Sequence, residues 1–192
     1  MAYPAVVLRV MLSAPSDVDE ELEVMRQVVQ RWNRTHSEAK QVVLLPLDYR
    51  ADAYPEVGSH PQHTVNRQLL AKCEILVAAF WSRIGTATGD HPSGTVEEID
   101  LHVRAHKPAL LYFSTRPTDP SQLDLDQLAA VRRYKEQMKS EAFYHEFDSP
   151  VNFSQLLTDD LARLMNESEY IPVSYTHLRA HETVLDLVCR LL

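Results

Sequence analysis

Short apolar runs alternate with longer amphipathic stretches along most of this chain. The run at 74–81 is continuously apolar, which is typical of a central strand buried on both faces of a sheet. Pro46 cannot donate a hydrogen bond to a neighbouring strand, so its run is expected near a sheet edge. The pattern predicts five strands, at 6–12, 42–49, 74–81, 108–114 and 142–147.

The stretches between these runs have the spacing of amphipathic helices. The first carries an apolar stripe from Leu22 to Trp32. Ser16 is expected to cap it, with Asp17 and Asp19 in the first turn, where acids suit the helix dipole. The predicted helices lie at about 17–35, 61–70, 95–106, 125–140 and 151–168.

Strands and helices that alternate in this way predict a parallel sheet with helices on both faces and right-handed crossovers. Five strands favour an α/β, flavodoxin-like three-layer sandwich with the strand order 2-1-3-4-5. In that order the first and third strands are neighbours, and a ligand crevice forms at their carboxyl ends. The segments there are SAPSD at 13–17 and WSRIGT at 81–86.

Composition narrows the function classes. The 192 residues fit one domain, and the formal net charge of −8 argues against general nucleic-acid binding. No apolar run approaches the roughly 20 residues of a membrane span, and the start of the chain lacks the features of a signal peptide. With only Cys73 and Cys189, a disulfide framework is not expected. Cys73 is expected to be a small buried hydrophobe. The expected compartment is the cytoplasm.

The last twenty residues, 173–192, are expected to lie outside the domain. Within them, VSYTHLRAHET resembles the translation of a transposon-type sequencing adapter. We therefore hypothesise that the domain comprises residues 1–172 and that the natural gene continued into a C-terminal domain absent from this sequence. The alternative is that 173–192 form a short amphipathic helix.

The loop after the third strand carries most of the candidate chemistry. Gly85 and Gly94 permit left-handed backbone or the close approach of a ligand. Ser93 or Thr95 is expected to cap the next helix, whose free amides would form an anion site. Hydroxyls of this loop, with Thr86 among them, are further candidate ligand contacts.

Three side chains near this loop have alternative interpretations. Arg83 could pair with a phosphate or carboxylate. Trp81 either packs in the core or lines the crevice. Glu97 and Glu98 are either surface acids that offset the helix dipole or carboxylates aimed at a bound sugar.

The sequence lacks the motifs of several other chemistries. It contains no Walker-type GxxxxGK[ST], GxGxxG, HExxH or GxSxG pattern. His102 and His106 are spaced as a metal-binding pair on a helix, but such pairs are more often solvated, and no metal is expected.

Four motifs occur in order and together resemble a TIR-like domain family of unknown function. They are SAPSDVDEE, LDYRADAYPEVGSHPQ, ILVAAFWSRIGTAT and SGTVEEI, which fall within residues 6–115. The resemblance implies a flavodoxin-like fold, related to TIR domains that cleave NAD and more distantly to nucleoside deoxyribosyltransferases. The family frequently has an arginine where this chain has Leu22, which puts any anchoring role of that position in doubt.

The resemblance also assigns roles by position. Ser13, Ser16 and Asp17 match the loop after the first strand, and the stretch from Asp48 to Gly58 matches a mobile loop after the second. The patterns SxTxxE, glutamate followed by an apolar residue, and GTxxE all select Glu98 as the central carboxylate.

These features predict a bacterial signalling or anti-phage defence module that binds a nucleotide or nucleoside. Its expected reaction is cleavage of the N-glycosidic bond of NAD or a related nucleotide by Glu98, with NAD as substrate and no cofactor. One alternative is a non-catalytic module that self-associates as a homo-oligomer or senses a nucleotide. Another is base exchange of the deoxyribosyltransferase type.

Overall fold

The computed structural model describes residues 2–58, 61–89, 91–118, 121 and 123–167. The chain divides into two compact units, residues 1–158 and 159–192. The sheet and the two pockets at its carboxyl edge belong to the first unit. The hypothesis about residues 173–192 falls outside the described residues.

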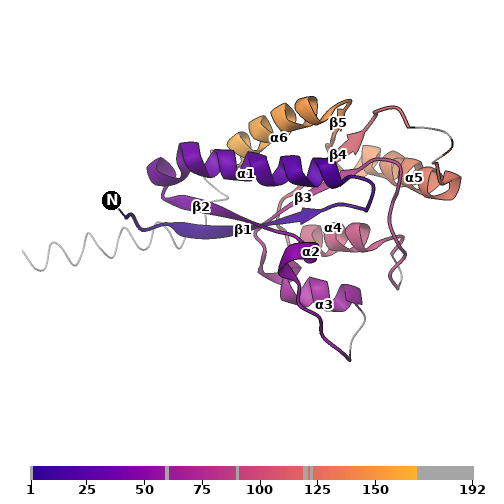
Figure 1. The fold of residues 1–192 in the computed structure, drawn as a ribbon, viewed down its shortest axis with the longest axis horizontal. Helices are drawn as coiled ribbons and strands as arrows, with labels where there is room; N and C mark the ends of the chain where they lie inside the picture. Colours follow the sequence, from indigo (N-terminus) through magenta and orange to yellow (C-terminus); the bar gives the residue numbers. More distant parts are fainter. Residues whose placement is uncertain (1, 59–60, 90, 119–120, 122, 168–192) are drawn as a thin grey trace, which may run out of the picture. The chain divides into compact units, whose positions relative to one another are not determined.

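The five strands and five of the described helices follow the order that the sequence predicts, whereas the short helix α2 lies where the sequence predicts the end of a strand and a loop (Figure 1). The strands are β1 (Val6–Ser13), β2 (Val42–Leu47), β3 (Ile75–Phe80), β4 (Ala109–Ser114) and β5 (His145–Phe147). The helices are α1 (Asp19–Lys40), α2 (Tyr49–Asp52), α3 (Pro61–Gln68), α4 (Gly94–Arg104), α5 (Leu125–Glu141) and α6 (Pro150–Leu164), with a short 3₁₀ turn, η1, at Leu70–Lys72.

The five strands form one parallel sheet in the order β2-β1-β3-β4-β5, which confirms the predicted flavodoxin-like topology. β1 is bracketed by its neighbours, since Val10 pairs with Pro46 on one side and Ile75 on the other. β2 is the edge strand expected from its proline. Helices α1 and the start of α6 cover one face of the sheet, and α4 and α5 cover the other (Figure 1).

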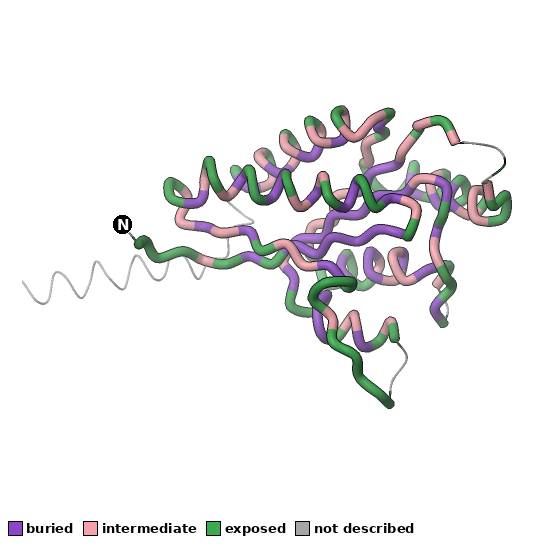
Figure 2. Tube along the Cα trace, in the orientation of Figure 1, coloured by how far each residue is buried: buried purple, intermediate pink, exposed green. Residues whose placement is uncertain are grey.

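Every residue of β3 is buried, as its continuous apolar run predicts (Figure 2). Phe80 stacks on Phe113 of β4 at 5.6 Å between ring centroids, and Tyr134 of α5 meets Phe80 edge-on at 5.5 Å. Cys73 is fully buried in the same cluster, and burial raises the pKa of its thiol to about 12. The expectation that Cys73 is a small buried hydrophobe is therefore confirmed.

Helix α1 differs from its predicted bounds at both ends. It begins at Asp19 after Val18, whose side chain makes no capping bond, so the prediction that Ser16 caps the helix is wrong. The Asp17 carboxylate is instead held by backbone amides after β3, which keeps this segment outside the helix. At the other end the helix continues past Thr35 to Lys40, where Gln41 closes it in a left-handed conformation with φ 55°.

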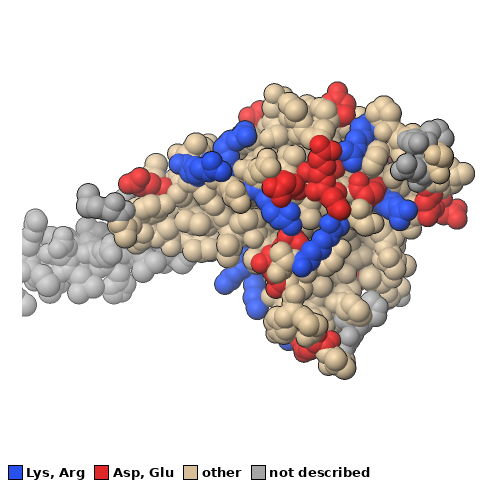
Figure 3. Space-filling model, in the orientation of Figure 1, with Lys and Arg blue, Asp and Glu red and all other residues tan. Residues whose placement is uncertain are grey.

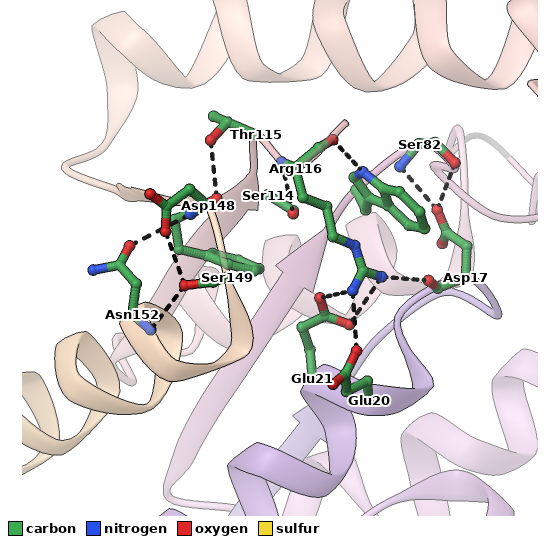
Figure 4. Close-up of polar contacts among 12 residues, drawn as sticks. Asp17, Glu20, Glu21, Ser82, Ser114, Thr115, Arg116, Asp148, Ser149 and Asn152 are labelled. Carbon is green, nitrogen blue, oxygen red and sulfur yellow. Dashed lines mark hydrogen bonds and ion pairs between the residues drawn. The ribbon is translucent and has the colours of Figure 1, made fainter. Parts of the chain in front are cut away.

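A buried ion pair joins the start of α1 to the segment that follows β4 (Figure 4). The Glu21 side chain is fully buried, and its Oε1 lies 3.0 Å from Nη1 of Arg116. The same guanidinium contacts Glu20 at 3.3 Å and the carbonyl of Asp17 at 3.4 Å. Burial raises the pKa of Glu21, and the positive charge of Arg116 opposes that rise. Arg116 thus supplies the cation for this acidic helix start.

Elsewhere charges of both signs are mixed. On the face drawn in Figure 3, Lys and Arg side chains lie among Asp and Glu side chains. Leu22, where the resembled family has an arginine, is buried under α1 with 4% exposure. Its apolar contacts make that position part of the core in this chain.

Replacing Arg116 with leucine is expected to lower the free energy of unfolding by about 3 kcal/mol, because it leaves the buried Glu21 carboxylate without its cation. Urea denaturation measures this loss. The exposed Arg133→Leu is the matched control and is expected to change stability by less than about 0.5 kcal/mol. Adding Glu21→Gln to Arg116→Leu is expected to recover much of the loss, and additive losses would contradict the pairing.

Candidate functional site

A pocket of about 460 Å³ lies at the carboxyl ends of β1 and β3, where the topology predicts a crevice. Five segments line it: the loop after β1, the start of α2, the start of α3, the loop after β3 and the first turns of α4. Their lining residues are Ser13, Ala14, Pro15, Ser16, Tyr49, Pro61, Gln62, Val65, Gly85, Thr86, Ala87, Thr88, Gly94, Thr95 and Glu98. Seven predicted site residues therefore meet here, namely Ser13, Ser16, Gly85, Thr86, Gly94, Thr95 and Glu98.

Glu98 is the acidic residue of this pocket. Only 4% of it is exposed, and both of its carboxylate oxygens are occupied by hydrogen bonds. The Ser13 hydroxyl at the end of β1 donates to Oε2, and Nε2 of Gln62 on α3 donates to Oε1 at 2.8 Å. Burial raises the pKa of Glu98, and these two hydrogen bonds oppose the rise. No lysine or arginine is among the described lining residues, so the carboxylate is held by neutral donors.

The first turn of α4 forms one wall of the pocket. Ser93 is its N-cap and accepts a hydrogen bond from the Val96 amide at 3.2 Å, which decides between the two caps that the sequence allows. Ser93 is fully buried and lies behind the wall. Gly94 and Thr95 line the pocket itself, and amides at such positions have no partner within a helix. They are therefore candidate donors to an anion.

The conformation of the loop after β3 depends on a glycine and on hydrogen bonds to a side chain of α5. Gly85 has φ 105°, and a Cβ there would lie 3.2 Å from Cβ of Ser93. Oε1 of Gln127 accepts hydrogen bonds from the amides of Ile84 at 3.0 Å and Gly85 at 3.1 Å. Gln127 was not anticipated, because nothing in the sequence signals which residue of α5 reaches this loop.

Gln62 is a second residue that the sequence did not reveal. Besides its bond to Glu98, its Oε1 lies against Gly94, where an added Cβ would come within 2.2 Å of it. Gly94 thus leaves room for the Gln62 amide in the position from which it bonds Glu98. Pro61 at the start of α3 offered a helix-initiation signal, but only the packing of the two helices brings Gln62 to the carboxylate.

The paired glutamates have different environments. Glu97 points to a separate set of donors, accepting hydrogen bonds from Asn66 Nδ2 at 2.7 Å and Thr88 Oγ1 at 2.6 Å. It does not line the pocket. Glu97 therefore ties α4 to α3 and to the loop after β3, whereas Glu98 faces the cavity.

Two predicted acidic contacts instead stabilise the loops around the pocket. Asp17 accepts hydrogen bonds from the amide and hydroxyl of Ser82, at 2.8 and 2.9 Å, and from the Arg83 amide at 2.9 Å. Asp48 caps α2 and pairs with Arg26 at 2.5 Å. Both carboxylates lie outside the lining of the Glu98 pocket, and Oδ1 of Asp17 is buried without a hydrogen-bond partner among the described residues.

Trp81 and Arg83 also lie outside the Glu98 pocket. Trp81 donates from Nε1 to the carbonyl of Arg116 at 3.0 Å, and the Arg116 guanidinium stacks 3.8 Å from its ring. Trp81 lines a different cavity at the same edge of the sheet. It is therefore neither a purely core residue nor part of the Glu98 pocket. The Arg83 side chain is exposed, which leaves its predicted pairing with a ligand anion without a place in this pocket.

The two histidines that the sequence spaces as a metal-binding pair, His102 and His106, do not lie on the same helix. Helix α4 ends at Arg104, and His106 lies beyond it with φ 56°. His102 is buried, and burial with the charge of Lys107 lowers its pKa to about 4. Across the residues that the structure describes, no group of three or more His, Cys, Asp or Glu side chains could hold a metal.

The sequence model of a domain of unknown function, DUF4062, matches residues 9–162. The chain belongs to this family. No curated protein sequence matches the chain. Within the described parts of the chain, no helix combines the length and apolar character needed to cross a membrane.

Solved structures resemble the DUF4062 chain in fold at low identity. Translation elongation factor SelB from Methanococcus maripaludis, in its apo form, is 8% identical, with a TM-score of 0.47 over 84% of this chain and 37% of that one. An Era variant from Aquifex aeolicus bound to GDP.AlF4− is 10% identical, with a TM-score of 0.43 over 88% and 58%. Oxidised flavodoxin 1 from Bacillus cereus is 13% identical, with a TM-score of 0.40 over 83% and 99%. Likenesses at this level concern the fold alone.

Replacing Glu98 with glutamine is expected to stabilise the protein increasingly as pH rises above about 4.5. The folded state raises the pKa of Glu98, so its stabilising form is the protonated one, and that contribution is lost as pH rises through the raised value. Thermal unfolding from pH 4 to 8 measures the difference, with about 2–4 °C in Tm for each 1 kcal/mol. Ser13→Ala removes a bond that lowers this pKa, so its deficit against wild type should also grow with pH. A Glu98→Gln advantage that shrinks with pH would contradict the assignment.

Gly94→Ala is expected to cost about 1 kcal/mol, because the added methyl displaces the Gln62 amide and breaks its bond to Glu98. Gln62→Ala removes the same bond directly. The double variant should lose no more than Gln62→Ala alone, as the clash disappears with the side chain. Urea unfolding of the four proteins measures the cycle, and losses that add up would show that Gly94 and Gln62 act separately.

Proposed function

We propose that this domain is a TIR-like signalling or defence module that binds a nucleotide in the Glu98 pocket and cleaves the N-glycosidic bond of NAD or a related nucleotide. The observation that carries the proposal is a buried carboxylate, lining a pocket at the point where the chain leaves β1 and β3 in opposite directions. That point is where ligands bind in open α/β sheets.

The pocket walls suit the sugar and phosphate parts of such a ligand. Hydroxyls of Ser16, Thr86 and Thr95 can bond ribose or phosphate oxygens, and the first turn of α4 supplies amide donors. A volume of about 460 Å³ matches one nucleoside moiety better than a whole dinucleotide. NAD would therefore place its nicotinamide riboside in the cavity and leave its other half outside.

The reaction needs one carboxylate near C1′ of the ribose. The bond from C1′ to the nicotinamide nitrogen breaks, and its electron pair neutralises the positive pyridinium ring. Water then bonds to C1′ and gives up a proton to solvent. The Glu98 carboxylate would stabilise the positive charge that develops on the sugar.

The raised pKa of Glu98 has a place in this scheme. An uncharged pocket favours the protonated acid, whereas a cationic nicotinamide nearby favours the carboxylate. Substrate binding would thus itself promote ionisation of Glu98. Turnover is expected to rise with pH as the acid ionises, which is the opposite of the effect of pH on stability.

Glu98→Gln is expected to lower kcat for NAD hydrolysis by about 100-fold or more, because it removes the charge that stabilises the transition state. The matched control is Glu97→Gln, which removes the same charge one residue away and outside the pocket. Its kcat should stay within about threefold of wild type. Release of nicotinamide by the full chain, and by a chain ending at residue 172, measures the rates.

Three other results would change the proposal in defined ways. Saturable NAD binding without turnover would overturn catalysis and support the non-catalytic sensor. Turnover that survives Glu98→Gln would remove Glu98 from the mechanism. Failure to bind NAD, ADP-ribose or a deoxynucleoside would overturn the nucleotide site itself.

A further inference from the structure

A second pocket of about 350 Å³ lies at the carboxyl ends of β3 and β4, beside the first half of α5. Among the described residues it shares no lining side chain with the Glu98 pocket. The segment Ser82–Gly85, which Asp17 and Gln127 hold in place, runs between the two lining sets. The two cavities are therefore separate parts of the same sheet edge.

The described lining of this pocket is basic, although the chain as a whole has a net charge of −8. It includes Arg116, Arg132 and Lys135 and no aspartate or glutamate. Cations gathered around a cavity of an acidic protein are not a consequence of composition. They indicate a site that favours negative charge.

Arg116 forms the rigid side of the pocket (Figure 4). Its guanidinium is stacked on Trp81 and anchored at its terminal nitrogens by Glu20, Glu21 and the Asp17 carbonyl. Its Nε is buried and has no hydrogen-bond partner among the described residues. A buried donor without a partner is uncommon in folded proteins.

Arg132 and Lys135 form the opposite side, one turn apart on α5. Lys135 pairs with Glu146 at 2.8 Å, so part of its charge is already offset. Arg132 is exposed and makes no ion pair or hydrogen bond with any described residue. Of the three cations in the lining, it is therefore the one whose charge no described acidic residue offsets.

The remaining lining is mixed. Trp81 and Leu128 are partly exposed apolar surfaces, and Ser114 and Thr115 contribute hydroxyls. Apolar surface beside a few polar groups is typical of small-molecule sites of 300–1,000 Å³. We propose that this pocket is a second binding site, for a small organic anion whose apolar body packs on Trp81 and Leu128 and whose phosphate or carboxylate group is bound by Arg132, Lys135 and Arg116.

Titration with phenyl phosphate tests this site, by calorimetry for affinity and, in a Trp32→Phe background where Trp81 is the single tryptophan, by fluorescence for location. Arg132→Gln is expected to weaken binding at least fivefold. Arg133→Gln is the matched control, because it removes an equally exposed charge from the next residue, outside the pocket, and it should weaken binding less than twofold. Phenol, which keeps the ring without the charge, and inorganic phosphate, which keeps the charge without the ring, should each bind at least fivefold more weakly. The affinity for benzoate, compared with that for phenyl phosphate, then shows whether the site prefers a carboxylate or a phosphate group.

The result is independent of the proposed reaction at Glu98. Phenyl phosphate should bind Glu98→Gln as tightly as wild type, and a clearly changed affinity there, including the tighter binding expected when a negative charge is removed, would assign the anion to the other pocket and overturn the second site. Equal weakening by Arg132→Gln and Arg133→Gln would reduce the effect to general charge attraction and also overturn it. So would the absence of binding or of any change in Trp81 emission.

Discussion

The bonds from Ser13 and Gln62 to Glu98 are the constraint on which the site depends. A buried carboxylate is costly unless it is well hydrogen-bonded, and here neutral donors from β1 and α3 provide the bonds in place of a cation. The Glu98 side chain thereby joins α4 to β1 and to α3. Among the described residues of the lining, no lysine or arginine offsets the charge of this acid.

Other acidic side chains around the pocket are hydrogen-bonded within the protein. Asp17 binds amides after β3, Asp48 caps α2, and Glu97 binds Asn66 and Thr88. A carboxylate can accept several hydrogen bonds, which lets one residue fix a whole loop. The net negative charge of the chain is thus partly a means of holding irregular loops in place around Glu98.

The sheet edge carries two cavities of opposite character. One holds a buried acid and no described cation, and the other is lined by three cations and no described acid. The ion pair between Glu21 and Arg116 lies at the basic cavity, while Gln127 and Asp17 stabilise the segment between them. Both cavities follow from parallel strands that end together, because their connecting loops must then meet at one edge.

The pattern of the sequence was enough to predict the five strands, their order, the place of the crevice and every described helix except the short α2. The spacing of apolar residues and the handedness of the crossovers can be read without knowing which side chains contact each other. Family-like motifs also singled out Glu98 from Glu97, and the structure places only Glu98 in the pocket. The tertiary structure alone decided which polar side chains meet. Gln62, Gln127 and Arg116 reach their partners across 36, 42 and 95 residues of chain, and no local pattern encodes such distances. For the same reason Trp81 was assigned to the core or the crevice, while packing against Arg116 places it in the second pocket.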